Sequence, residues 1–342
     1  TGIELRRQGV KATVNSGSTA DFGQVVRVEE IDGDYVDNHW PKAVSGQIYR
    51  KTAVTSWSST GNAPATPDAL WSGWSKQNRH AANDWSDVMT FCSTWQSVAY
   101  SHFSGAAVGN VAAGTWNNAA FSDTETATLA AVADLDYFAR WLAVMTIMPN
   151  NEPNLTTGED DDYAGAFISD GTTTRFYPVP HDMDSTFGLG ESTYAYNISG
   201  LYDITEVDTS AQKNTRAGVG SVTLMEPLLP LLGNSTKAGN AAFRARYFLA
   251  IRELFGSVFD ADTTGNAYPP FHQFVDNHIG WVPAATRTTI KTFMKQRQAY
   301  LLGLIGAAKI TPAEATSDPG THASPAPSPL RLNEVLALNT AS

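Results

Sequence analysis

The stretch AGAFISDGTTTRFYPVPHDMDSTFG, residues 164–188, carries the clearest structural signal in the chain. Its two apolar runs, 164–169 and 174–180, flank an Asp-Gly pair at 170–171, and Asp-Gly between such runs is a strong signal for a tight turn joining two antiparallel strands. Two acidic residues, Asp182 and Asp184, follow the second run directly. The sequence therefore predicts a β-hairpin that leads straight into a pair of carboxylates.

The two carboxylates predict a cation-binding site. Because side chains alternate along an extended backbone, Asp182 and Asp184 are expected on the same side of the chain. Carboxylates that are this close repel each other unless a cation or a proton lies between them. A hard ion such as Mg²⁺ commonly takes one or two carboxylates together with phosphate oxygens, so the pair could hold one ion or two adjacent ones.

A second acidic segment, PNNEPNLTTGEDDDY at 149–163, lies between an apolar helical run and the hairpin. It contains Glu152 and a run of four acids that ends at Asp162. Such a run is most often a solvated turn. Its position before the hairpin favours a metal role, because protein kinases order their parts in the same way: a loop with a catalytic base and a metal ligand, a strand pair, then a metal-binding Asp.

Composition excludes several classes of protein. The chain has 342 residues, of which 42% are hydrophobic, so a sizeable folded core is expected and disorder of the whole chain is excluded. The net charge of −11 argues against nucleic acid as a partner, since phosphate backbones require clustered Lys and Arg. The single cysteine, Cys92, lies among apolar residues and is interpreted as a small buried hydrophobe. No run reaches the roughly 18 apolar residues of a membrane span.

The order of elements is strands first and helices after. Residues 10–15, 22–31 and 46–54 read as strands, with a short helix at 33–41, and the Ser-, Gly- and Pro-rich stretch 56–80 reads as a connection. Helical periodicity marks 81–103, with Asn83 or Asp84 as the cap, and also 135–148, 243–259 and 285–305. Residues 189–222 are expected to form an irregular loop. Trp85, Trp95 and Trp141 fall at core-facing helical positions, so packing explains them better than sugar binding does.

Four segments of the sequence resemble those of a known family. The segments FYPVPHDMDSTFG and NNEPNLTTGEDDDY, together with VVRVEEIDGDYVDNHW followed by GQIYRK near the start, are similar to motifs of the kinase-like spore coat protein H (CotH) family. The resemblance covers residues 1–306. It implies an α+β, two-lobe protein-kinase-like fold within residues 1–310, with a partial N-terminal β lobe at 1–55 and a mainly helical C-terminal lobe at 81–306.

The resemblance also implies roles for individual residues. Asp182 corresponds to the metal-binding Asp of kinases, with Asp184 beside it as a second metal-binding or orienting carboxylate. Glu152 falls where the family has its catalytic-loop Asp, and Asp162 falls where an Asn usually holds the second metal. The extra methylene of Glu152 moves its carboxylate by about one C–C bond, and positioning dominates phosphoryl transfer. The added negative charge at Asp162 favours a divalent cation but repels ATP if no second ion binds.

For the nucleotide, the predicted residues within this chain are Lys51 and Glu29. The resemblance further implies that Thr1 begins inside the N-terminal lobe of a longer protein, and that the principal nucleotide-binding Lys and any targeting signal lie upstream. Three other cations could meet a substrate phosphate, although each is more often a surface charge: Lys76, Arg140 and Arg175.

The C-terminal part predicts an exported, multi-domain protein. Residues 311–329 form a Pro-, Ser- and Ala-rich linker, and LRLNEVLALN, which begins at residue 330, resembles the first strand of a lamin-tail domain, so 330–342 is expected to start a second domain. Such domains are often appended to extracellular bacterial proteins. An extracellular or cell-surface location is therefore expected.

Three functions follow, in order of preference. The first is a secreted or surface-associated kinase-like protein that uses ATP with Mg²⁺ or Mn²⁺ and phosphorylates Ser or Thr of a protein substrate. The second is an inactive or weakly active pseudokinase that serves as a structural or adhesive module, with the acids idle or holding Ca²⁺. The third treats Asp182-Met183-Asp184 as the Asp-x-Asp of a glycosyltransferase, and it ranks last because strands and helices do not alternate.

Overall fold

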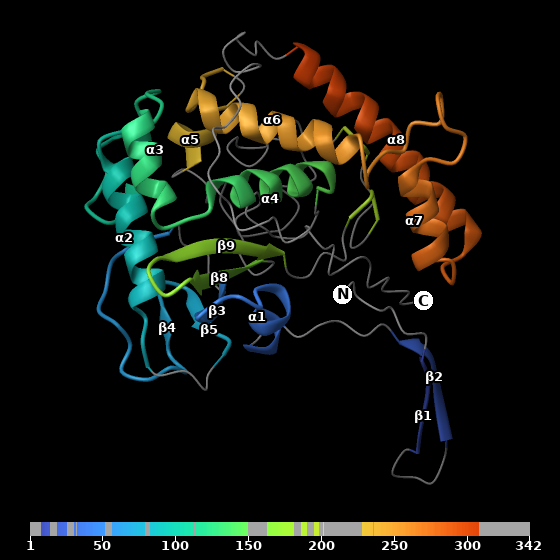
Figure 1. Ribbon diagram of the computed structural model, residues 1–342, viewed down its shortest axis with the longest axis horizontal. Helices are drawn as coiled ribbons and strands as arrows, with labels where there is room; N and C mark the ends of the chain where they lie inside the picture. Colours follow the sequence, from blue (N-terminus) through green and yellow to red (C-terminus); the bar gives the residue numbers. More distant parts are fainter. Residues whose placement is uncertain are drawn as a thin grey trace.

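The computed structural model describes residues 8–13, 19–25, 31, 33–51, 57–78, 83–111, 114–149, 163–180, 186–189, 195–197, 201, 228–234 and 236–307. These residues form a mixed α+β structure with eight helices and nine strands, and all strand pairs are antiparallel (Figure 1). The α+β class expected from the sequence is therefore confirmed. The predicted linker and lamin-tail segments, 311–329 and 330–342, and most of the predicted loop at 189–222, lie outside the described residues.

A five-stranded sheet with the order β4-β5-β3-β8-β9 forms the centre of the fold. Strand β3 (Ser45–Lys51) is its middle strand and pairs with both β5 (Trp74–Lys76) and β8 (Tyr163–Ser169). Strand β9 (Thr174–Pro180) forms one edge and pairs with β8. The sheet thus takes strands from the first 80 residues and from the middle of the chain.

The hairpin predicted around Asp170 is confirmed as β8 and β9. Residues 170–173 form its loop, in which the Asp170 carboxylate accepts hydrogen bonds from the backbone N–H groups of Thr172 and Thr173, both at 2.8 Å. The Asp170 N–H in turn donates to the Thr173 carbonyl at 3.2 Å. The Asp side chain therefore folds the backbone in the way expected of a turn-forming residue.

The prediction of a plain connection over residues 56–80 is wrong. Strand β4 (Leu70–Trp71) and strand β5 form a second hairpin that extends the sheet. Its two-residue turn has positive φ angles at Ser72 (48°) and Gly73 (79°), the conformation of a type I′ turn. The signal was the Ser-Gly pair between two tryptophans, which the Ser- and Gly-rich composition of the segment obscured.

Strands β1 (Gln8–Thr13) and β2 (Thr19–Val25) pair with each other in a two-stranded sheet of their own. These strands overlap the predicted strands at 10–15 and 22–31, and both begin earlier than predicted. The predicted short helix is confirmed as α1 (Gly33–His39).

Both faces of the central sheet are covered, as the alternation of buried residues along β3 shows. Ile48 belongs to a small apolar cluster with Tyr35 and Val36 of α1, whereas Tyr49 belongs to the large core. Helices α2 (Ser86–Tyr100) and α4 (Leu135–Ile147) cover that second face, and both contact β9. Figure 1 shows α1 and α4 on opposite sides of the hairpin.

The core-facing assignments made from periodicity are confirmed. Trp85, Trp95 and Trp141 are all buried, as is Cys92. The prediction for the start of the first long helix needs correction, because α2 begins at Ser86 rather than near residue 81, and its N-cap, Trp85, makes no capping bond through its side chain.

The remaining helices pack around α4. Helix α6 (Ala241–Phe255) lies along α4, and α8 (Ala284–Ala307) contacts both of them. Helix α7 (Pro270–His278) packs on α8, and α3 (Asp123–Ala130) packs on α2. The smaller elements are α5 (Leu229–Leu232), β6 (Phe103–Ser104) and β7 (Thr115–Trp116).

Candidate functional site

Most of the predicted site residues lie outside the described part of the chain. These are Glu29, Glu152, Asp162, Asp182 and Asp184. Their roles stay predictions. The described residues that flank them nevertheless show how the neighbouring chain is held.

The described residues next to both acidic segments lie at one end of the central sheet. Strand β8 starts at Tyr163 and β9 ends at Pro180, and these two residues are direct partners across the hairpin. The next position along the sheet pairs Ala164 with Arg50 of β3, so Lys51, the last residue of β3, lies at the same end. We call this end of the sheet the hairpin edge.

A turn at Thr186–Leu189 holds the chain that follows the second acidic segment. The Leu189 N–H donates to the Thr186 carbonyl at 3.1 Å. Phe187 is 2% exposed, and its ring centroid lies 5.7 Å from that of Phe271 on α7 and 6.4 Å from that of Phe293 on α8. Phe187 adopts a φ of 58°, which is costly for a bulky residue and persists only where packing fixes it.

Arg297 of α8 holds the end of α4, just before the first acidic segment. Its side chain is fully buried and donates to the Thr146 carbonyl through Nη2 at 2.6 Å and through Nε at 3.2 Å. Its Nη1 donates to the Tyr196 carbonyl at 2.8 Å. The Thr146 hydroxyl also bonds the Tyr247 hydroxyl of α6 at 2.7 Å. The helix end is therefore fixed by both neighbouring helices.

Lys76 of β5 is not the surface charge that the sequence suggested, because it is 1% exposed. Its Nζ donates to the Asp84 carbonyl at 2.7 Å, and burial lowers its pKa. On the neighbouring strand the Tyr49 hydroxyl donates to Asp87 of α2 at 2.7 Å, and burial raises the pKa of that carboxyl. The cluster ties the sheet to the start of α2.

Arg140, in contrast, is a surface charge, as expected. It pairs with Glu253 of α6 at 3.3 Å, and nearly half of each side chain is exposed.

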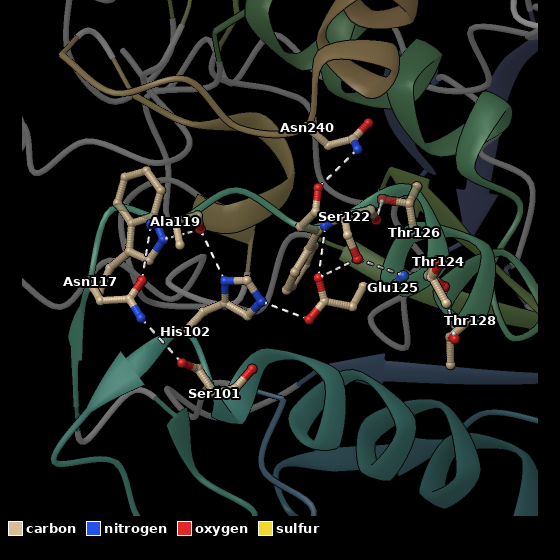
Figure 2. A network of polar contacts seen from close by, with 12 residues as sticks. Ser101, His102, Asn117, Ala119, Ser122, Thr124, Glu125, Thr126, Thr128 and Asn240 are labelled. Atoms are coloured by element: carbon tan, nitrogen blue, oxygen red, sulfur yellow. Dashed lines mark hydrogen bonds and ion pairs between the residues drawn. The ribbon is translucent and has the colours of Figure 1, made fainter.

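A polar network beside the core connects three segments through His102 (Figure 2). The ring Nε2 lies 2.9 Å from a carboxylate oxygen of Glu125, and Nδ1 lies 3.0 Å from the Ala119 carbonyl. The other Glu125 oxygen accepts from the N–H and from the hydroxyl of Ser122, each at 2.7 Å. Both ring nitrogens thus face oxygen atoms of the neighbouring segments.

The network is a structural clamp rather than a catalytic triad. The Ser122 hydroxyl donates to the Glu125 carboxylate and not to the His102 ring, so the nucleophile–base pair of a triad is not formed. Ser122 and Glu125 instead form a capping box at the start of α3. Asn240, the N-cap of α6, completes the clamp, because its amide donates to the Phe121 carbonyl at 3.0 Å.

No protein-family model matches the chain, and no curated protein matches it. Within the described ranges, no group of three or more His, Cys, Asp or Glu side chains could hold a metal ion. No described helix is long and apolar enough to cross a membrane.

Two features of this region were not predicted from the sequence. The short α3 was missed, although Ser122 and Glu125 carry the spacing of a capping box. The burial of Lys76 was also missed, and its only signal was its place two residues after Trp74 in a segment that was not recognised as a strand.

Proposed function

We propose that this chain is a kinase-like domain, with a two-lobe fold resembling that of the CotH family, which transfers phosphate from ATP to Ser or Thr of a protein substrate with the help of Mg²⁺ or Mn²⁺. The hairpin edge is the observation that carries the proposal. In kinases a catalytic loop precedes a strand pair, and the metal-binding Asp follows it directly. Here the flanks of the two acidic segments, Tyr163 and Pro180, are direct partners across the sheet.

The anchoring of the flanking chain supports this proposal. Phosphoryl transfer depends mainly on positioning, so the groups that hold metal and nucleotide require rigid support. Phe187 is packed between α7 and α8 after the second acidic segment, and Arg297 fixes the end of α4 before the first one. Rigid elements thus adjoin both acidic segments.

Under this proposal, Asp182 and Asp184 bind the metal, Asp162 contributes to a second metal position, and Glu152 accepts the proton of the substrate hydroxyl. Lys51 and Glu29 contribute to nucleotide binding. The location of Lys51 at the hairpin edge favours its role. By the same resemblance, the domain belongs to an exported bacterial protein with further domains.

Calorimetry with ATP tests the binding half of the proposal. Titration of ATP into the intact parent protein in the presence of MnCl₂ or MgCl₂ is expected to give saturable binding that EDTA abolishes. Asp182→Asn is expected to weaken binding at least about tenfold, since it removes a carboxylate from the metal. Asp37→Asn is the matched control, because Asp37 is an exposed carboxylate on α1.

Absence of ATP binding with either metal would overturn the kinase proposal. Stabilisation by Ca²⁺ alone, with no response to ATP, would instead favour the pseudokinase function. The replacements at Glu152 and Asp162 are the sequence observation behind that second candidate.

A further inference from the structure

A cavity of about 390 Å³ lies near the turn of the β8–β9 hairpin, at the opposite end of these strands from the hairpin edge. Its walls are α3, the start of α4, the start of α6 and Arg175 of β9. Arg175 pairs with Ile168 close to the hairpin turn, whereas the hairpin edge lies at Pro180, the other end of the same strand. The cavity is therefore separate from the proposed phosphoryl-transfer site, and its volume is within the range of small-molecule sites.

The cavity combines an apolar floor with charged walls. Phe243, Leu135 and Ala133 are buried beneath it. Ligand sites commonly have this composition, with an apolar lining and a few polar groups that fix orientation. The charged residues of the walls are Asp123, Asp134, Asp136, Arg175 and Arg246.

Two of these charged side chains pair with each other, and a third, Asp134, caps a helix. Arg246 forms an ion pair with Asp136. Asp134 caps α4 by accepting from the Tyr137 N–H at 3.0 Å. Asp123, in the first turn of α3, has one carboxylate oxygen 3.3 Å from the Asn240 amide. The other Asp123 oxygen has no hydrogen-bond partner in the described part of the chain.

Arg175 is the cation with capacity left for a ligand. Its Nε donates to the Ala130 carbonyl at 3.3 Å, which fixes the guanidinium at the cavity wall. Burial and Asp134 raise the pKa of the Tyr177 hydroxyl to about 12, whereas Arg175 acts to lower that pKa through its charge and a side-chain hydrogen bond. No carboxylate in the described ranges forms an ion pair with Arg175. A guanidinium of this kind binds a carboxylate in bidentate fashion.

The whole cavity is close to electrically neutral. The first turns of α3, α4 and α6 all line it, and each helix start carries a partial positive charge that offsets the acids. A ligand with only one kind of charge would therefore leave an opposite charge unsatisfied. A ligand with a carboxylate and an ammonium group would use both Arg175 and Asp123.

We propose that this cavity binds a small zwitterion, an α-amino acid or dipeptide, with its carboxylate on Arg175, its ammonium group near Asp123 and its side chain over Phe243. The clamp of His102, Glu125 and Asn240 holds the α3 wall in place behind the site. The proposal is independent of the kinase proposal, because it requires neither ATP nor metal.

Binding measurements without nucleotide or metal test the proposal. Each of the twenty amino acids and a set of dipeptides with free termini is screened by thermal shift, and hits are titrated by calorimetry at low ionic strength. At least one zwitterion is expected to bind saturably. Its N-acetyl analogue and its C-terminal amide analogue are each expected to bind at least about tenfold more weakly.

Variants of Arg175 and Asp123 test which side chain binds the carboxylate of the ligand and which binds its ammonium group. Arg175→Gln is expected to weaken the zwitterion at least about tenfold and to remove the preference for the free carboxylate over the amide, whereas Arg175→Lys keeps part of that preference. Asp123→Asn is expected to remove the preference for the free amine over the N-acetyl form. Arg140→Gln, at an exposed ion pair, is the control and is expected to bind as the wild type does.

The proposal fails if no zwitterion binds, if the blocked analogues bind equally well, or if folded Arg175→Gln and Arg175→Lys both retain wild-type affinity. Circular dichroism melting of each variant establishes that it is folded. Loss of ATP binding in the Asp182 variant has no bearing on this outcome, so the two proposals succeed or fail separately.

Discussion

Three almost fully buried polar side chains, Lys76, His102 and Arg297, connect segments that are far apart in the sequence. A buried polar group is costly unless hydrogen bonds satisfy it, and each of these three has oxygen partners at short distance. Removal of one such side chain leaves its partners in the core without a donor. These residues are therefore expected to contribute more to stability than exposed charges do.

Arg297→Met tests this expectation at α8. The change removes the bonds to the Thr146 and Tyr196 carbonyls while keeping much of the side-chain volume, and is expected to lower the free energy of unfolding by about 2–4 kcal/mol. Arg252→Met is the matched control, because Arg252 is exposed on α6, and it is expected to change stability by less than about 0.5 kcal/mol. Urea denaturation measures both. Equal effects of the two changes would contradict the anchoring role of Arg297.

Glu125 predicts a pH dependence of stability. Partial burial alone would raise the pKa of Glu125, but hydrogen bonds from His102 and Ser122 outweigh burial, so the pKa lies below its usual value of 4.5. A carboxyl with a lowered folded pKa stabilises the fold fully above its unfolded pKa, and this contribution is lost as the pH falls through the folded value. Stability is therefore expected to fall as the pH drops below about 5.

Unfolding measurements between pH 3 and 7 test this dependence with a matched pair of variants. Glu125→Gln is expected to flatten the profile below pH 5. Glu253→Gln, at an exposed ion pair, is expected to keep the wild-type slope. A wild-type slope in the Glu125 variant would show that the clamp does not hold an ionised Glu125.

At the scale of elements, the β8–β9 hairpin is held by close packing of aromatic rings against bare backbone. Phe176 of β9 stacks on Phe91 of α2 with ring centroids 4.3 Å apart, and it also contacts Phe167. Gly165 of β8 gives this ring its space, because a Cβ added there would lie 2.5 Å from Phe176 Cε2. A substitution at Gly165 therefore pushes on the centre of the core.

Gly165→Ala is expected to destabilise the protein by about 1–3 kcal/mol through overpacking. Gly303→Ala is its counterpart, since a Cβ at this exposed α8 position meets nothing within 4 Å and is expected to stabilise the helix by about 0.5–1 kcal/mol. Thermal melting of the two variants gives the comparison. A neutral Gly165→Ala would mean that Phe176 moves aside at little cost.

The same elements show what sequence patterns can predict. Periodicity and turn chemistry predicted the β8–β9 hairpin and helices α4, α6 and α8, because those signals are local and extend over several turns or a full strand pair. The β4–β5 hairpin was missed because its strands have only two and three residues, too few for alternation to register. Short elements depend on tertiary packing, and Trp71 and Trp74 supply that packing here.

At the scale of the whole molecule, pairing between distant strands could not be predicted from the sequence. Tyr49 of β3 pairs with Gly165 of β8. The sequence of neither strand identifies its partner, because the alternation of apolar and polar residues indicates which face is buried and not which strand lies alongside. This pairing places Lys51 at the hairpin edge. Of the predicted site residues, Lys51 is the one whose backbone the structure describes, and the roles of all six stay predictions.

The central proposal is that the acidic segments joined to the hairpin edge form a phosphoryl-transfer site. The most direct test is transfer of labelled phosphate from ATP to protein Ser or Thr by the full-length protein, in the presence of Mn²⁺ or Mg²⁺. The account predicts metal-dependent labelling by the wild type and by the Asp37→Asn control, and loss of labelling in Asp182→Ala. Equal labelling by the wild type and Asp182→Ala would contradict the site, and no labelling by a folded wild type that binds ATP would contradict catalysis.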